Sequence, residues 1–159
     1  MAQTPARGSF AELENLPAST FLRHREPMLL LDRVLNLEPE FGVCEWRISP
    51  SNSFIINGLG VPSYVGIEYM AQCIAVHAGA RARVKGNAPP LGFLLGTRQY
   101  EARIPYFVEG VTYQATCQQL IRSADGMGSF DCKIIQDGRI LAEARLAVLE
   151  KVEGMMLDV

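Results

Sequence analysis

Residues 61–84 read VPSYVGIEYMAQCIAVHAGARARV and form an almost uncharged apolar run. Drawn as an α-helix, the run places apolar side chains around nearly its whole circumference, which is typical of a helix that protein covers on several sides. Pro62 suits the first helical position, and Gly86 follows a last turn that contains Arg81 and Arg83. The run therefore predicts a central helix of about 24 residues, roughly 36 Å long, which only a broad sheet covers.

One carboxylate, Glu68, lies near the start of this run. A carboxylate among apolar neighbours has to be paired, hydrogen-bonded or neutral, and such groups serve as general acids or bases. Tyr64 and Gln72 lie at i−4 and i+4, on the same helix face, where Tyr64 can donate a proton and Gln72 can orient the carboxylate. The structural alternative is an acid that stabilises the helix dipole or pairs with Arg98 or Arg103.

The remaining segments predict strands. Several of them show the period-2 alternation of a strand, and turn-forming residues such as Asp137-Gly138 separate them. Residues 50–61 are dense in turn formers and predict a loop that leads into the helix. The expected strands lie at 28–38, 43–49, 91–105, 111–123, 128–138 and 139–151. A long helix packed against an antiparallel sheet is an α+β architecture.

The composition indicates the number of domains and argues against several classes of partner. The chain has 159 residues, of which 48% are hydrophobic and 20% charged, with a formal net charge of −2, as expected of one globular domain. The basic residues are scattered, which argues against nucleic acid or an anionic membrane as a partner. The four cysteines lack metal-site spacing and predict reduced core thiols in a cytoplasmic protein. No window is long and apolar enough to predict a membrane span or a signal peptide.

Four segments together resemble the hotdog-fold beta-hydroxyacyl-acyl carrier protein dehydratases. They are RHREPMLLLDRVLNLEP at 23–39, GIEYMAQ at 66–72, GFLLGTRQYEARIPYFVEG at 92–110 and DGRILAEARLAVL at 137–149. Within that group the chain is most similar to the ApeP-like dehydratase-related proteins of aryl polyene pigment clusters. The resemblance implies a hotdog fold, in which a curved antiparallel sheet wraps the long helix. It also implies a dimer whose pockets lie at the subunit interface and admit a phosphopantetheine arm.

The sequence departs from this family at one catalytic position. The dehydratases carry a histidine in an H-F-P-G-x-P-x-M-P-G loop ahead of the helix, and the helix supplies the acidic partner, which Glu68 matches. Here the loop SFIINGLGV contains no histidine. His77 is rotated by about 900° from Glu68 and displaced by about 13 Å, so it cannot be the partner within one chain. His24 lies in the Arg23-His24-Arg25 turn, which matches a motif that the family uses structurally, and a catalytic role is the alternative interpretation of this residue.

The resemblance and the helix spacing together give a set of expected site residues. Glu68 and Tyr64 are the expected catalytic groups, and the expected substrate-binding residues are Ser63, Gly66, Gln72 and Phe93. The unpaired amides at the helix start, around Ser63 and Tyr64, are expected to stabilise charge on a thioester oxygen. We expect neither a cofactor nor a metal.

The sequence leaves three functions open. The first is a dehydratase that acts on 3-hydroxyacyl thioesters in fatty acid or polyene synthesis, with Glu68 and an unconventional second group. The second is an acyl-thioester-binding subunit that completes the pocket of an active dehydratase. The third is a hotdog thioesterase that uses a helix carboxylate with water. The expected partners are an acyl carrier protein or acyl thioester, in a homodimer or a heterodimer. The expected domain spans residues 16–152, between an arm at 1–15 and a tail at 153–159.

Overall fold

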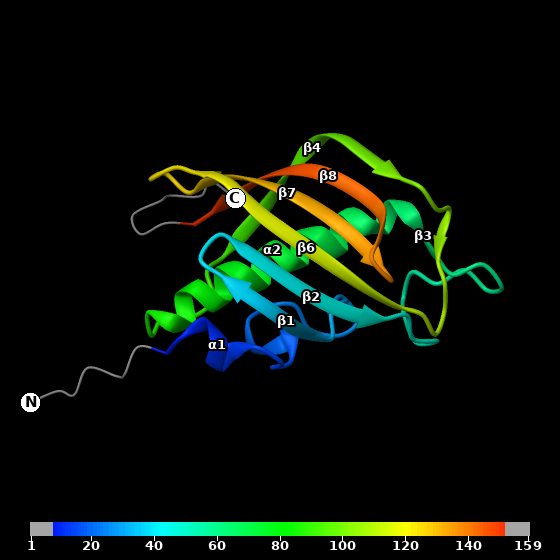
Figure 1. Cartoon of the computed structure of the whole chain (residues 1–159), viewed down its shortest axis with the longest axis horizontal. Coiled ribbons are helices and arrows are strands. Elements are labelled where there is room, and N and C mark those ends of the chain that lie inside the picture. The colour runs from blue at the N-terminus through cyan, green and yellow to red at the C-terminus, as the bar shows by residue number, and fades with distance from the viewer. Residues whose placement is uncertain (1–7, 152–159) are drawn as a thin grey trace, which may run out of the picture.

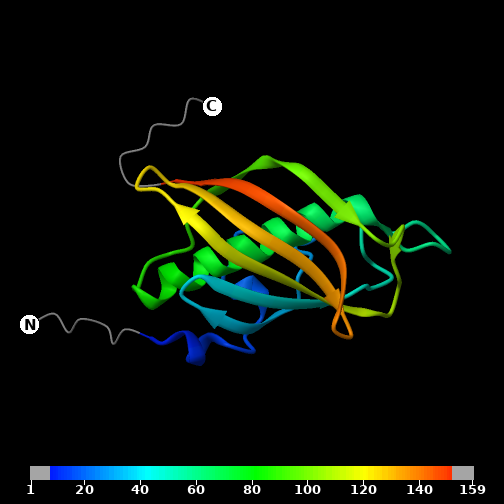
Figure 2. The same ribbon diagram turned by 45° about the horizontal axis from the view of Figure 1, so that its top comes forward.

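A computed structural model describes residues 8–151 and places one long helix, α2, across one face of an antiparallel sheet (Figure 1). The sheet has six strands in the order β1-β2-β6-β7-β8-β4, and a separate two-stranded ribbon pairs β3 with β5. Figure 2 shows the strands curving over α2, which leaves β1 and β4 as the two sheet edges. This is the predicted α+β hotdog architecture.

The elements follow the predicted order along the chain. Their bounds are α1 Phe10–Leu13, η1 Ala18–Thr20, β1 Arg33–Glu38, β2 Phe41–Arg47, β3 Val61–Pro62, η2 Ser63–Val65, α2 Gly66–Val84, β4 Gly92–Ala102, β5 Tyr106–Phe107, β6 Thr112–Arg122, β7 Met127–Gln136 and β8 Arg139–Glu150. The expected tail at 153–159 and the first part of the expected arm lie outside the described residues.

The central helix is shorter than predicted. Pro62 belongs to β3, a 3₁₀ turn follows it, and the α-helix begins only at Gly66 and has 19 residues. The Ser63 amide donates to the Pro105 carbonyl (2.9 Å), so a neighbouring loop holds the chain out of helical register at this point. The predicted end is confirmed: Gly86 has a φ of +79° and its amide donates to the Arg83 carbonyl (2.9 Å).

The first predicted strand is also shorter than its apolar run. Residues 28–32 are not in a strand, and β1 begins at Arg33. The amide of Leu30 donates to the side chain of Gln72 (3.0 Å), a bond that diverts this segment from the sheet to the helix. The predicted hairpin at Asp137-Gly138 is confirmed, since both residues have positive φ and join β7 to β8.

The core lies between α2 and the inner face of the sheet. Strand β6 alternates buried and accessible positions, as the period-2 pattern predicts. The bulkiest part is an aromatic cluster, in which Trp46 stacks on Tyr69 of the helix with ring centroids 4.2 Å apart. Phe107 and Tyr113 meet Trp46 at centroid distances of 6.3 and 5.9 Å. This cluster fixes the first half of α2, and with it the direction in which Glu68 points.

Candidate functional site

Glu68 lies in the first turn of α2 and is held by a side chain one turn further on. The amide nitrogen of Gln72 donates to Glu68 Oε1 at 2.9 Å. The Glu68 side chain is 33% exposed, so it is half-buried, and Gln72 is fully buried. The structure therefore brings together the expected acid and the residue expected to orient it, at the i, i+4 spacing that one helix face provides.

Gln72 is itself fixed by the segment that precedes β1. Its amide nitrogen also donates to the Met28 carbonyl (2.7 Å), and its amide oxygen accepts from the Leu30 amide (3.0 Å). A buried amide whose nitrogen and oxygen both have partners has one favoured orientation. The position of Glu68 Oε1 is thus set by contacts with residues distant in sequence.

A histidine lies beside this carboxylate. His24 Nε2 is 3.7 Å from Glu68 Oε1, and the imidazole is 37% exposed. Its segment is anchored on both sides: the Arg23 guanidinium donates to the Pro89 carbonyl (2.7 and 3.1 Å), and Arg25 donates to the Leu22 and His24 carbonyls (2.7 and 2.8 Å). The chain therefore presents a titratable pair, although the family's histidine loop is absent.

Both members of this pair line a cavity of about 230 Å³. The cavity follows one face of α2 from Glu68 in the first turn, past Ala71, Ala75 and Ala78, to Arg81 in the last turn. At about 1.5 Å per residue, this path is roughly 20 Å long. Its opposite walls come from residues 21–24, 90–94 and 148–150, together with Phe130 of β7. An elongated, mostly apolar groove with titratable groups at one end suits a substrate with an acyl chain.

An ion-pair network lies at the far end of the cavity. Glu150 accepts from Arg81 (3.0 Å) and from Arg122 (3.3 Å), and its side chain is 19% exposed. Two arginines on one half-buried carboxylate tie the end of α2 to β6 and β8. The network also places a polar boundary opposite the Glu68 end.

The start of α2 differs from the expected arrangement. The Ser63 amide is already bound to Pro105, and the Ser63 carbonyl accepts from the Tyr100 hydroxyl, so Ser63 offers no free amide to a thioester. Desolvation raises the pKa of Tyr100 to about 12, which keeps this hydroxyl a donor. Gly66 is buried, and a Cβ there would collide with the Tyr100 hydroxyl. This close approach explains why position 66 is a glycine.

Tyr64 and Phe93 are placed differently from each other. Tyr64 is 70% exposed and is not among the residues that line the cavity with Glu68. It belongs to the 3₁₀ turn, so the i−4 relation expected of a continuous helix does not apply. Phe93 lies on β4 and lines the same cavity as Glu68, with 40% exposure.

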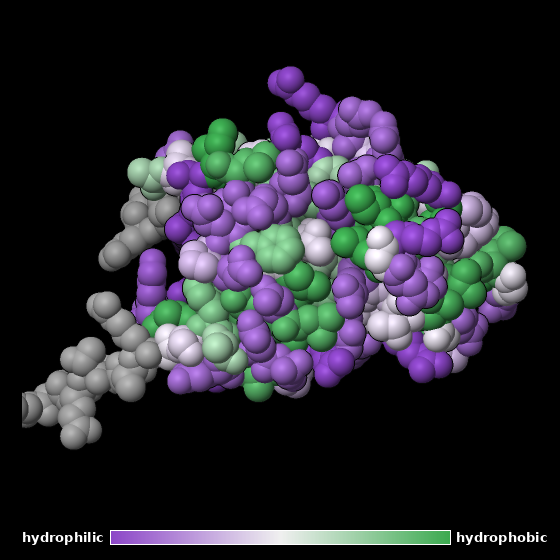
Figure 3. Space-filling model, viewed as in Figure 1, coloured by the Kyte–Doolittle hydropathy of each residue, from purple (hydrophilic) through white to green (hydrophobic). Residues whose placement is uncertain are grey.

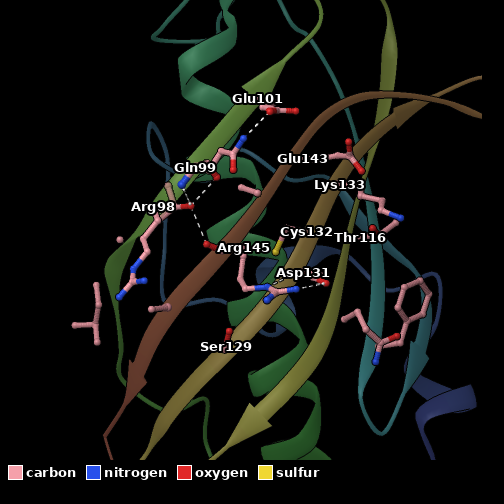
Figure 4. Close-up of a pocket in the computed structure, with 17 residues that line it drawn as sticks. Arg98, Gln99, Glu101, Thr116, Ser129, Asp131, Cys132, Lys133, Glu143 and Arg145 are labelled. Carbon is pink, nitrogen blue, oxygen red and sulfur yellow. Dashed lines mark hydrogen bonds and ion pairs between the residues drawn. The ribbon is translucent and has the colours of Figure 1, made fainter.

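The two arginines considered as partners for Glu68 lie elsewhere. Arg103 pairs with Glu143 (2.8 Å), and Arg98 lines a broad hollow of about 1200 Å³ on strands β4, β6, β7 and β8. Figure 4 shows this hollow, in which Arg145 points toward Asp131 and binds it at 2.7 Å. The Arg145–Asp131 ion pair belongs to the lining of this hollow, and Glu68 does not.

Two further observations concern the described residues as a whole. Among residues 8–151, no group of three His, Cys, Asp or Glu side chains is placed to hold a metal ion. In the same part of the chain, no helix has the length and apolar character that crossing a membrane requires. The groups present at the Glu68 end are a carboxylate, an imidazole and an oriented amide, which suit proton transfer.

The fold and this site together define a hotdog protein of the acyl-thioester dehydratase class. A family model described as ApeP-like, ApeP dehydratase, matches residues 16–156. The 3-hydroxyacyl-[acyl-carrier-protein] dehydratase FabZ of Burkholderia mallei is 31% identical over 135 residues, covering 80% of this chain and 84% of the relative. The chain belongs to the ApeP-like dehydratase family.

Solved structures share this fold. A chain of the dehydratase heterocomplex ApeI:P from Xenorhabdus doucetiae superposes with a TM-score of 0.81 at 29% identity, covering 87% of this chain and 93% of that one. A hypothetical thioesterase with coenzyme A from Streptococcus pneumoniae superposes with a TM-score of 0.58 at 10% identity, covering 75% of this chain and 84% of that one. At that identity the second likeness concerns the fold alone.

Two parts of the site are not among the expected site residues. His24 is 44 residues before Glu68 in sequence, so only the tertiary fold brings them together. The available signal was the RHREPM motif, which places a histidine next to the segment that crosses the helix. The Arg81–Glu150 end of the groove had no sequence signal, because its members come from distant elements.

Proposed function

We propose that this protein acts on 3-hydroxyacyl thioesters carried by an acyl carrier protein, and that the reaction is loss of water. The observation that carries the proposal is the position of Glu68, half-buried, oriented by Gln72 and lining an apolar groove roughly 20 Å long. Membership of the ApeP-like dehydratase family and the likeness to FabZ support this reaction class.

Loss of water from a 3-hydroxyacyl thioester requires a base at C2 and an acid at the leaving hydroxyl. We assign the acid role to Glu68, because its Oε2 has no hydrogen-bond partner among residues 8–151 while Oε1 is held by Gln72. The small side chains of Ala71, Ala75 and Ala78 leave room for the acyl chain along the helix. Phe93 supplies an apolar wall of the groove.

A second candidate function is that of a binding subunit in a complex with a related dehydratase. One structural relative is a chain of a dehydratase heterocomplex, and this chain lacks the family's histidine loop. Apolar side chains are also left uncovered. Figure 3 shows apolar patches at the end of the molecule where β3 lies and also elsewhere on this face. Leu94 and Leu95 on the edge strand β4 are 41% and 52% exposed.

The thioesterase hypothesis has less support. The thioesterase likeness is at 10% identity and concerns the fold alone. The side-chain amide of Gln72 already binds Glu68 Oε1, and the His24 imidazole lies 3.7 Å from the same oxygen. We place the activity in the cytoplasm, which four buried free cysteines support, since reduced thiols persist there.

The test is an assay of the purified protein, alone and co-purified with a related dehydratase, on a 3-hydroxyacyl-acyl carrier protein. Appearance of the 2-enoyl thioester with the protein alone is the expected result. Product only in the presence of the related dehydratase supports the binding subunit. Release of free acid supports the thioesterase, and neither product under either condition contradicts all three readings.

A further inference from the structure

We infer that His24 is the base of this site and that it works with Glu68 as one proton-transfer pair within a single protomer. The inference rests on the proposed loss of water and names the second group that this reaction requires. The geometry that carries it is the 3.7 Å separation between His24 Nε2 and Glu68 Oε1, with both side chains lining the same cavity.

The surroundings of His24 suit a group that exchanges protons with a ligand. The imidazole is 37% exposed, the residue lines the groove, and its Nδ1 is buried without a hydrogen-bond partner among the described residues. The backbone on either side is fixed by Arg23 and Arg25, so the ring is presented at a defined place.

The other histidine has no comparable access. His77 is fully buried, its Nε2 is 2.8 Å from the Glu38 carbonyl, and its ring stacks on Phe10. It is not among the residues that line the groove. Because the chain contains two histidines, His24 is the only one that can reach a substrate beside Glu68.

The reaction balances with these two groups and no further reactant. Neutral His24 takes the proton from C2 of the 3-hydroxyacyl thioester, and the C2–H electron pair forms the C2=C3 double bond as the C3–O bond breaks. The departing oxygen takes a proton from the Glu68 carboxyl group and leaves as water. The resulting imidazolium and carboxylate are neighbours at 3.7 Å, so the proton passes from His24 to Glu68 and restores both groups.

The experiment compares His24→Gln, His24→Ala and wild-type protein in the dehydration assay. We expect His24→Gln to lower kcat/KM by about 100-fold or more, the usual contribution of a general base. Added imidazole should restore part of the activity of His24→Ala, because it can enter the space left by the ring. The acid-side limb of the pH profile, where the base becomes protonated, should be lost in His24→Gln.

The matched control is Glu26→Gln, an exposed residue of the same loop that does not line the groove; it should keep wild-type activity. Thermal unfolding of each variant shows whether it is folded. Wild-type water loss that persists in His24→Gln overturns this inference and leaves the proposed function standing. A large loss without imidazole rescue and with the acid limb intact overturns the base role. Wild-type protein that releases no water overturns both proposals.

Discussion

At the scale of single residues, the two histidines have opposite environments. His24 is partly exposed beside a carboxylate, whereas His77 is fully buried against a carbonyl. Burial lowers the pKa of His77 below its ordinary value, against the opposing effect of the Glu38 carbonyl, and nearby Arg81 lowers it further. The same residue type therefore supplies a candidate base at one place and a core side chain at the other.

The lowered pKa of His77 gives a pH dependence of stability. Below about pH 6.5 the unfolded chain takes up a proton at this histidine more readily than the folded chain, so the free energy of unfolding falls as the pH drops. His77→Gln, whose amide can still donate to Glu38, should show a smaller loss between about pH 8 and about pH 5. Urea unfolding of both proteins at each pH measures this. An equal loss in wild type and variant contradicts the assignment.

Residue-scale prediction from sequence succeeded where the relation was local. Glu68 and Gln72 are four positions apart on one helix, and the structure places them in contact. Tyr64 has the same spacing on the other side, yet it lies outside the groove, because the preceding turn is 3₁₀ rather than α-helical. His24 joins the site through tertiary contacts alone, which local spacing does not report.

At the scale of elements, glycines allow α2 to pack closely on its neighbours. Gly79 is buried, and a Cβ there would collide with the backbone carbonyl of Phe21. The segment that leads to His24 can lie against the helix only because this position has no side chain. Periodicity predicted that the helix is covered on several sides, but it did not show which segment covers each side.

Gly79→Ala tests this packing. Alanine favours helices over glycine by about 1 kcal/mol, so an isolated helix would gain stability. We instead expect a loss of about 1–3 kcal/mol in the free energy of unfolding, because the carbonyl of Phe21 is backbone and has little room to move. The control is Gly92→Ala, where the nearest atom to the added Cβ is 3.7 Å away. A stability equal to or above wild type in Gly79→Ala contradicts the close approach.

At the scale of the whole molecule, the edge strand β4 has the features of an association surface. Strand β4 is an 11-residue edge strand, and most of its residues are exposed. Exposed apolar side chains and unpaired backbone groups on an edge strand are typical of a surface that pairs with another chain. This edge borders the groove through Phe93 and Leu94, so association there would also enclose the site.

We predict that the protein self-associates through β4, or binds a related dehydratase there. Leu95→Lys places a charge on this edge and should lower the mass measured by sedimentation from that of a dimer to that of the 17.5 kDa chain. Ile121→Lys, at a position 66% exposed near the end of β6, is the control and should remain a dimer. A dimer that Leu95→Lys leaves intact contradicts the β4 interface.

The central claim is that Glu68 takes part in proton transfer during loss of water. The most direct measurement is the rate of 2-enoyl thioester formation from a 3-hydroxyacyl-acyl carrier protein by wild-type protein and by Glu68→Gln, which keeps the shape and removes the acid. We predict a fall of about 100-fold or more in kcat/KM with unchanged thermal stability. A folded Glu68→Gln protein that forms the product at the wild-type rate would contradict it.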